Sequence, residues 1–179
     1  MRPTANDLLP QELARMSVEA FIRQGIVIQP PDNPKGVLAE SAGAFVTLRF
    51  LDGRLRGCIG TIEAAHSTVA EEIIHNAISA AIRDRRFVPV TNNELPDLTY
   101  SVDVLSIPEP ARGPEDLDPA VYGVIIESVE LHRHGLLLPG IDGLESVEAQ
   151  WLAVHAKAGI RPGSPVRVSR FTVTRFGKD

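Results

Sequence analysis

The sequence predicts an α+β fold in a single domain, with a mainly antiparallel sheet flanked by helices. The expected strands come in adjacent or hairpin-connected pairs, and helices separate these groups instead of alternating strictly with strands. The chain has 179 residues, of which 44% are hydrophobic. This length is enough for one well-buried core and too short for two ordinary domains.

The first elements expected along the chain are a helix and a tight hairpin. Helical spacing of apolar residues predicts a helix from Pro10 to Gln24, which Gly25 ends. Alternating residues in the segment 44–59 predict two paired strands, and Asp52-Gly53 suits the centre of a type I′ turn between them.

A second helix should follow the hairpin, because Thr68 and Glu71 form a capping box and an apolar stripe continues to Ile82. A third helix is expected from Ser146 to Ala158. The prolines between 108 and 119 predict a long loop with at most one short helix, around 115–117. Further strands are expected at residues 99–105, 121–126, 131–138 and 166–176.

The register of the hairpin decides which side chains share a face. With a two-residue turn, Arg49 lies opposite Arg56, and Thr47 lies opposite Cys58. These four side chains then lie on one face. The core face collects Val46, Leu48, Phe50, Leu55 and Ile59. Two arginines directly opposite each other repel by up to about 1 kcal/mol, so a carboxylate or a ligand is expected between them.

Cys58 is the only cysteine of the chain and the candidate nucleophile. A thiolate is nucleophilic, and a nearby guanidinium can lower the thiol pKa from about 8.5. Gly57 and Gly60 would let a substrate or another backbone approach the strand closely. The alternative is a packed cysteine whose neighbouring arginines pair with acids such as Asp84 or Asp103.

Catalysis by a cysteine usually needs a base, and the histidine spacing supplies no recognised motif. His66 and His75 are candidates, but solvated or structural roles explain them better. His132 and His134 would share a strand face, and two histidines without a third ligand do not predict a metal site. We therefore expect no metal and no cofactor in this chain.

Charge and hydropathy exclude some classes of protein. The formal net charge of −5 argues against a broad surface for nucleic acid, although a local basic pocket remains allowed. No segment approaches the roughly 20 apolar residues that span a bilayer, and the polar residues 1–7 lack the apolar region of a signal peptide. We expect a soluble, cytoplasmic protein.

Several motifs occur in a fixed order along nearly the whole chain. They are the segments 55–61, 80–89, 101–106, 117–119, 122–124, 135–139 and 157–160. This pattern resembles the AMMECR-one domain family, which includes the bacterial AmmeMemoRadiSam system protein A. Arg85 stands where the usual form of the second motif has proline.

The resemblance implies a two-lobed domain of unassigned biochemical activity, with a larger lobe built from both termini and a smaller lobe. It also implies partnership with a Memo-like protein, similar to metal-dependent dioxygenases, and with a radical S-adenosylmethionine protein. The metal and the iron-sulfur cluster would belong to those partners.

Two function classes follow from these observations. In the first, the protein is an enzyme, or a substrate-binding component of one, that takes a small anionic or nucleotide-like ligand beside Cys58. Its candidate ligand-binding residues are Thr47, Arg49, Arg56, Gly57, Gly60, Asp84 and Arg86. In the second, the protein is a noncatalytic adaptor whose hairpin face docks a partner. We prefer the first, because a cysteine between glycines and near arginines suits a concave site.

Overall fold

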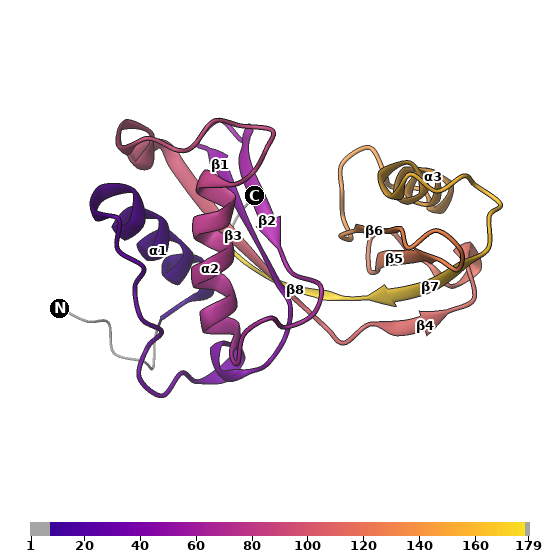
Figure 1. Ribbon diagram of the computed structural model, residues 1–179, viewed down its shortest axis with the longest axis horizontal. Coiled ribbons are helices and arrows are strands. Elements are labelled where there is room, and N and C mark those ends of the chain that lie inside the picture. Colours follow the sequence, from indigo (N-terminus) through magenta and orange to yellow (C-terminus); the bar gives the residue numbers. More distant parts are fainter. Residues whose placement is uncertain (1–7, 178–179) are drawn as a thin grey trace. The chain divides into compact units, whose positions relative to one another are not determined.

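The computed structural model describes residues 8–177, which form two compact units (Figure 1). Among these residues, unit 1 comprises 8–104 and 174–177, and unit 2 comprises 105–173. Each unit has its own four-stranded sheet and its own hydrophobic core. The α+β fold class with antiparallel pairing is therefore confirmed.

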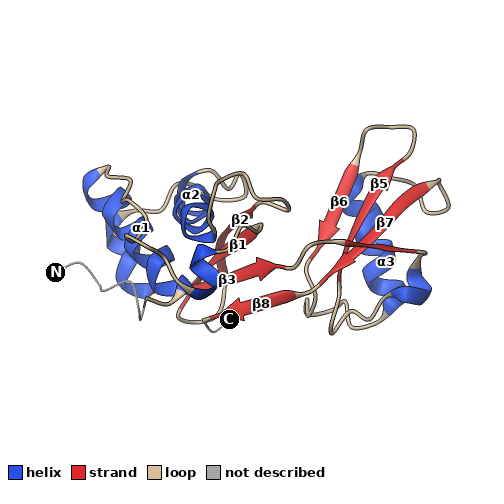
Figure 2. Ribbon diagram, turned by 90° about the horizontal axis from the view of Figure 1, so that it is seen from below, coloured by secondary structure: helices blue, strands red, loops and turns tan. Residues whose placement is uncertain are grey.

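Unit 1 combines a sheet of strand order β2-β1-β3-β8 with two long helices. The strands are β1 (Ala44–Phe50), β2 (Leu55–Gly60), β3 (Leu98–Leu105) and β8 (Val173–Phe176). The helices are α1 (Pro10–Gln24) and α2 (Val69–Ile82), with short 3-10 helices η1 (Gly36–Ala39) and η2 (Asn92–Asp97). Both long helices lie on one face of the sheet (Figure 2). The α2 helix packs on β1 and β2, which leaves β2 as an edge strand beside the end of this helix.

Local capping sets the ends of both long helices, and both predicted ranges are confirmed. In α1, Pro10 takes the first helical position, and Gly25 ends the helix with a left-handed φ of 69°. In α2, the Thr68 side chain accepts a hydrogen bond from the backbone N–H of Glu71. These contacts lie within a few residues of each other, which is why the sequence alone predicts them.

The hairpin between β1 and β2 differs from the prediction at its turn. The N–H of Gly53 donates to the carbonyl of Phe50, the N–H of Phe50 donates to the carbonyl of Arg54, and Gly53 has a φ of 87°. The loop therefore contains three residues, with glycine at the left-handed position after the turn, instead of a two-residue type I′ turn. Arg49 consequently lies opposite Leu55 and not opposite Arg56.

A β-bulge at Arg56 restores the expected register farther along β2. The pairs Leu48–Gly57 and Thr47–Cys58 form as predicted, because Arg56 is an extra residue with no partner on β1. Leu55 shares the face of Arg49 and does not join the core face, which corrects its predicted place.

Unit 2 has a sheet of order β4-β7-β5-β6, on which one helix packs. Its elements are β4 (Glu109–Ala111), η3 (Pro114–Asp116), β5 (Gly123–Ser128), β6 (His134–Leu137), α3 (Val147–Ala158) and β7 (Val166–Phe171). The α3 helix contacts β5 and β6, and Val124, Ile126 and Val154 are fully buried between them. The short strand β4 was not predicted.

The expected strand at 166–176 is in fact two strands in two sheets. Between β7 and β8, the N–H of Thr172 donates to the hydroxyl of Ser106, and the N–H of Ser106 donates to the carbonyl of Thr172. Residues 105 and 173 begin and end unit 2, so these bonds tie together the two chain segments that connect the units. A strand-like composition cannot show that the chain changes sheets partway.

No helix in the segment 8–177 is long and apolar enough to cross a membrane. The expectation of no signal peptide rests on residues 1–7, which lie outside the described part of the chain.

Candidate functional site

Cys58 lies on edge strand β2 and is held by two hydrogen bonds from different elements. The hydroxyl of Thr47 on β1 donates to the Cys58 sulfur at 3.2 Å. The backbone N–H of Cys58 donates to Oδ2 of Asp84 at 2.9 Å. Thr47 and Asp84 were both candidate site residues, and the structure brings both to the cysteine.

Asp84 is a buried carboxylate that joins the cysteine to an arginine. It accepts hydrogen bonds from the backbone N–H, Nε and Nη2 of Arg86, at 3.1, 2.9 and 2.7 Å respectively. The Arg86 guanidinium, helped by the backbone N–H groups of Cys58 and Arg86, lowers the pKa of Asp84 to about 2 against the opposing effect of burial. The carboxylate is therefore ionised at neutral pH and fixes one edge of the guanidinium.

Arg56, two residues before Cys58 on β2, forms a similar pair. Its Nε and Nη2 donate to the two carboxylate oxygens of Glu94, at 2.7 and 3.2 Å. The Arg56 guanidinium lowers the pKa of Glu94 to about 2. Only 5% of the Arg56 side chain is exposed, and its Nη1 is buried without a hydrogen-bond partner in the described part of the chain.

The ring of Phe87 lies beside both arginines. The guanidinium carbons of Arg56 and Arg86 are 5.8 and 5.5 Å from the ring centroid, within range of cation-π attraction. Each guanidinium is held side-on by its carboxylate through Nε and Nη2, so neither pairing uses Nη1. The two remaining nitrogens can each donate to a further acceptor.

The two glycines beside Cys58 make room for the protein itself. A Cβ on Gly57 would lie 2.2 Å from the carbonyl oxygen of Ala80 in α2, so the glycine lets this helix approach β2. A Cβ on Gly60 would lie 2.3 Å from the ring of Phe45. Of the two occupants that the sequence allowed, a substrate or another part of the chain, the structure shows the chain at both positions.

Arg49 does not join the group around Cys58 in the predicted way. It is not opposite Arg56, and its Nη1 donates to the carbonyl of Gly53 at 3.1 Å. The expected repulsion between two facing arginines is therefore absent, because the bulge separates them. The Nε of Arg49 is buried and has no hydrogen-bond partner among residues 8–177.

Burial raises the pKa of the Cys58 thiol, and this effect outweighs the others. The hydrogen bond from Thr47 and the charge of Arg86 act in the opposite direction, while the charges of Asp103 and Asp84 raise the pKa further. Arg86 is thus the arginine that favours the thiolate, a role that the sequence suggested for Arg56.

No histidine in the described part of the chain hydrogen-bonds Cys58. His66 and His75 stack on each other instead, with ring centroids 4.2 Å apart. Asp103, the other acid expected to pair with an arginine, pairs with Arg175 at 2.7 Å. The described residues therefore supply a thiol that is influenced by Arg86, without a hydrogen-bonded base.

Sequence reasoning missed Glu94, which holds Arg56 from 38 residues away. A usable signal was present, because Thr91 and Glu94 have the same spacing as Thr68 and Glu71 and form a capping box. The Glu94 carboxylate accepts from the backbone and hydroxyl of Thr91 and also from Arg56.

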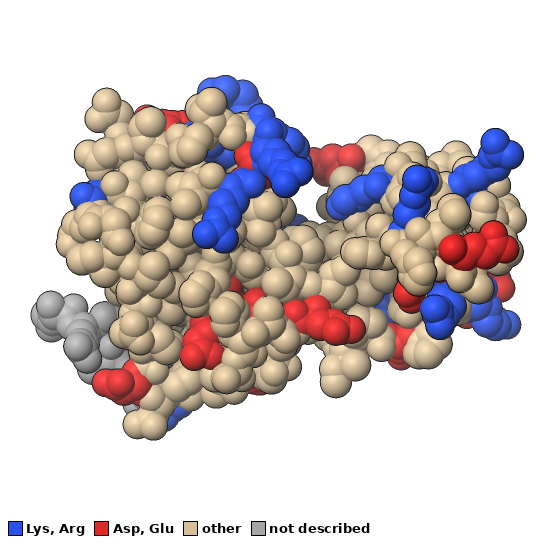
Figure 3. Space-filling model, viewed as in Figure 1, with Lys and Arg blue, Asp and Glu red and all other residues tan. Residues whose placement is uncertain are grey.

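Basic side chains gather on the surface of unit 1 (Figure 3). The Arg86 side chain is 56% exposed although its carboxylate partner is buried. A charged ligand can therefore reach Arg86 from solvent, whereas Arg56 lies beneath the surface.

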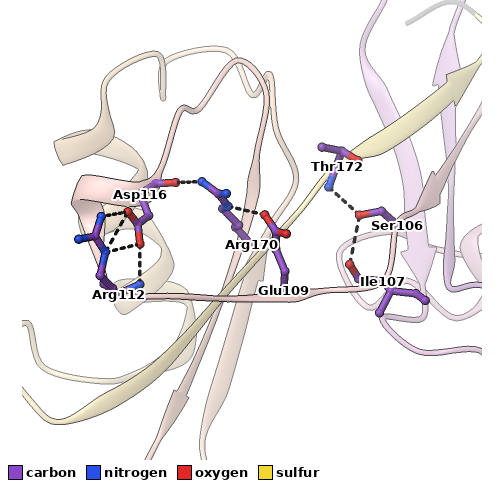
Figure 4. Close-up of polar contacts among 7 residues, drawn as sticks. All are labelled: Ser106, Ile107, Glu109, Arg112, Asp116, Arg170 and Thr172. Carbon is purple, nitrogen blue, oxygen red and sulfur yellow. Dashed lines mark hydrogen bonds and ion pairs between the residues drawn. The ribbon is translucent and has the colours of Figure 1, made fainter.

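A second polar cluster lies within unit 2 (Figure 4). Arg170 donates to Glu109 and to the carbonyl of Asp116, both at 2.7 Å, and its guanidinium lies 4.2 Å from the centroid of the Tyr122 ring. Arg112 pairs with the Asp116 carboxylate. These contacts are internal and hold the segment 109–122 onto β7. The described residues hold no group of three or more His, Cys, Asp or Glu that could bind a metal ion.

Comparison with known proteins identifies one family. The AMMECR1 family profile matches residues 11–178. A Thermotoga maritima protein is 47% identical over 161 residues, which cover 89% of this chain and 91% of that protein. A Clostridium acetobutylicum protein is 42% identical over 92% of this chain, but the match spans only 35% of that longer protein.

A solved structure shows the same fold. The crystal structure of the uncharacterized protein PH0010 from Pyrococcus horikoshii matches with a TM-score of 0.85 and 31% sequence identity. The match covers 95% of this chain and 90% of that one. None of these names states an activity.

Proposed function

The chain belongs to the AMMECR1 family, and from its own site we propose that it is an enzyme, or the ligand-binding component of one. Its ligand is a small anionic or nucleotide-like molecule held beside Cys58 by Arg56 and Arg86. The observation that carries this proposal is the buried Nη1 of Arg56, which has no acceptor among the described residues.

An unpaired buried donor is costly. Leaving such a group without a partner costs about 1–3 kcal/mol, and more for a charged group. More than nine in ten buried polar groups in proteins are paired. Because Glu94 fixes the guanidinium plane of Arg56, Nη1 is directed away from that carboxylate. A ligand oxygen, or a water that the ligand replaces, would satisfy it.

Arg86 and Phe87 supply the remaining features of a ligand site. Asp84 orients Arg86 in advance, so little side-chain entropy is lost when an anion binds its free nitrogen. The half-buried Phe87 ring provides an apolar surface next to both charges. An aromatic ring beside guanidinium groups suits a ligand that has both a planar part and an anionic part.

Binding is the first role that we propose for Cys58. Burial raises the pKa of its thiol, so the ligand-free protein holds a neutral thiol and not a prepared nucleophile. A covalent step would need the bound ligand, or a base that the ligand brings, to remove the thiol proton. Without such a covalent step, the Cys58 sulfur would make only a noncovalent contact with the ligand.

Nuclear magnetic resonance tests the proposal directly. Inorganic phosphate, AMP and ATP are titrated separately into ¹⁵N-labelled protein, with sodium chloride at matched ionic strength as the reference. We expect a saturable shift of the Nε–Hε signals of Arg56 and Arg86 and of the Cys58 amide for at least one of the three probes. Arg86→Gln should weaken that binding by about tenfold or more, the size of one charge-assisted hydrogen bond.

Arg54→Gln is the matched control. Arg54 lies on the same hairpin, is 72% exposed and pairs with Asp52 at 2.7 Å, but it makes no contact with Phe87. Its loss should leave the affinity unchanged. Shifts identical to those caused by sodium chloride, or equal losses in the two variants, would reject a ligand site at these arginines.

A noncatalytic adaptor is the second candidate, and two observations favour it. Val88 and Leu51 are 76% and 68% exposed on unit 1, which suits a protein contact. The Clostridium acetobutylicum relative joins a similar domain to a longer chain, as expected for a domain that works with others. Its partners would be a Memo-like protein and a radical S-adenosylmethionine protein.

A single cysteine suits the reducing cytoplasm, which is the location we propose.

A further inference from the structure

The turn that follows α2 carries charges that the Cys58 site does not use. We define the α2 turn as residues 83–89. Its Arg83 and Arg85 are exposed and make no ion pair or side-chain hydrogen bond with the described residues. Arg83 lies at the C-terminal end of α2, where its positive charge interacts favourably with the helix dipole. The helix dipole does not account for the arginine at position 85.

The backbone of the α2 turn is held in one conformation. The N–H of Phe87 donates to the carbonyl of Asp84 at 3.0 Å, and the N–H of Val90 donates to the carbonyl of Ala81 at 2.9 Å. The Asp84 side chain adds bonds to Arg86 and to the Cys58 strand. Arg83 and Arg85 are therefore presented from a rigid base, which lowers the entropy cost of docking.

An exposed apolar side chain lies within the same turn. Val88 is 76% exposed and is followed by the exposed Pro89. Figure 3 shows that basic side chains gather on this unit. A rigid turn that places unpaired arginines next to an exposed valine has the composition of a protein-binding surface, in which arginine is enriched among the residues that dominate affinity.

We propose that the α2 turn docks an acidic segment of a partner protein, with Arg83 and Arg85 pairing to its carboxylates and Val88 contacting an apolar residue between them. Charge complementarity selects this partner, because the turn is locally basic on a chain whose net charge is −5. The same net charge opposes nucleic acid, which needs a broad positive surface. The inference does not depend on a ligand at Cys58, since neither Arg83 nor Arg85 contacts that cluster.

Selection from a random twelve-residue peptide display library tests the proposal with the intact protein. We expect the selected peptides to be enriched in Asp and Glu around an apolar residue. The double variant Arg83→Glu/Arg85→Glu should bind a selected peptide at least about tenfold more weakly, and Val88→Ser should also weaken it. All three substituted positions are exposed, and circular dichroism checks that each variant is folded. If the reversal variant does not fold, Arg83→Gln/Arg85→Gln replaces it.

Arg161→Glu is the control, because Arg161 is an exposed arginine of unit 2 whose side chain has no ion pair with the described residues. It should bind the peptide as the wild type does. A selection without acidic enrichment, or equal binding by the reversal variant and the wild type, overturns the proposal. Binding of a twenty-nucleotide oligo-dT that is lost in the reversal variant overturns the proposal in favour of a nucleic-acid partner. Self-association that the reversal variant abolishes overturns it in favour of a second copy of this chain.

Discussion

The backbone N–H of Cys58 donates a 2.9 Å hydrogen bond to the carboxylate of Asp84, 26 residues farther along the chain. The bond joins the edge strand β2 to the turn after α2. The same carboxylate holds Arg86, so one buried side chain fixes both the strand that carries the thiol and the arginine that acts on it. It also occupies an outward-facing donor of an edge strand, which would otherwise be open to pairing with another chain.

Replacing Asp84 by asparagine should therefore destabilise the protein in a pH-dependent way. The folded-state pKa of Asp84, about 2, lies below the ordinary value, so its contribution is complete above about pH 4 and is lost as the pH falls toward 2. Asp84→Asn should lower the free energy of unfolding by about 1–2 kcal/mol at pH 7. The difference from the wild type should disappear near pH 2.

Urea unfolding measured from neutral to acid pH checks this prediction. The stabilising contribution of Glu94, whose pKa is also about 2, is lost in the same pH range. Only the difference in unfolding free energy between the wild type and Asp84→Asn therefore isolates the effect of Asp84. Asp142→Asn serves as control, because Asp142 is an exposed carboxylate of unit 2 without an ion pair in the described part of the chain. A loss that is constant across the pH range would show that Asp84 acts through shape and not through charge.

The reactivity of Cys58 should be low at neutral pH and should depend on Arg86. Because burial raises the pKa of the thiol, alkylation by iodoacetamide should follow an apparent pKa above that of a free thiol. Arg86→Gln should raise this pKa further, since it removes the positive charge that favours the thiolate. Arg56→Gln should leave it nearly unchanged. A pKa below the free-thiol value in the wild type would instead support an activated nucleophile.

Local and long-range interactions explain which features the sequence could predict. The ranges of α1 and α2 follow from caps formed within a few residues, and the Thr47–Cys58 pair follows from alternation along two strands. The position of Arg56 depends on a bulge and on Glu94, 38 residues away, and no local pattern specifies either. The pairing of Asp84 with an arginine was therefore among the predicted alternatives, whereas the partner of Arg56 was not.

The segment 166–176 also shows that a local sequence pattern does not specify long-range partners. Residues 166–176 have uniform strand character, and only their partners decide that β7 joins β5 while β8 joins β3. Sequence composition predicts extended backbone, but the sheet that receives it depends on distant segments.

The glycine at position 57 should be required for the packing of α2. Gly57→Ala would place a Cβ 2.2 Å from the Ala80 carbonyl oxygen, and a helix backbone cannot yield as a flexible side chain can. We expect a loss of about 2–3 kcal/mol in the free energy of unfolding, measured in urea. Gly53→Ala in the same hairpin meets no atom within 4 Å and should cost only about 1 kcal/mol, from its positive φ. Equal losses would mean that α2 can move away from β2.

Arg170 should stabilise unit 2 through its fixed geometry and not through its charge alone. Arg170→Lys keeps the charge but loses the planar contact with Tyr122 and one of the bonds to Glu109 and the Asp116 carbonyl. The free energy of unfolding should fall, and amide hydrogen exchange should speed up in residues 109–122. Arg167 lies on the same strand, is 71% exposed and pairs with Glu127 at 3.5 Å. Because such surface pairs contribute little, Arg167→Lys should change stability by no more than about 0.5 kcal/mol. If the two variants lost equal stability, the network around Arg170 would be no more than a surface ion pair.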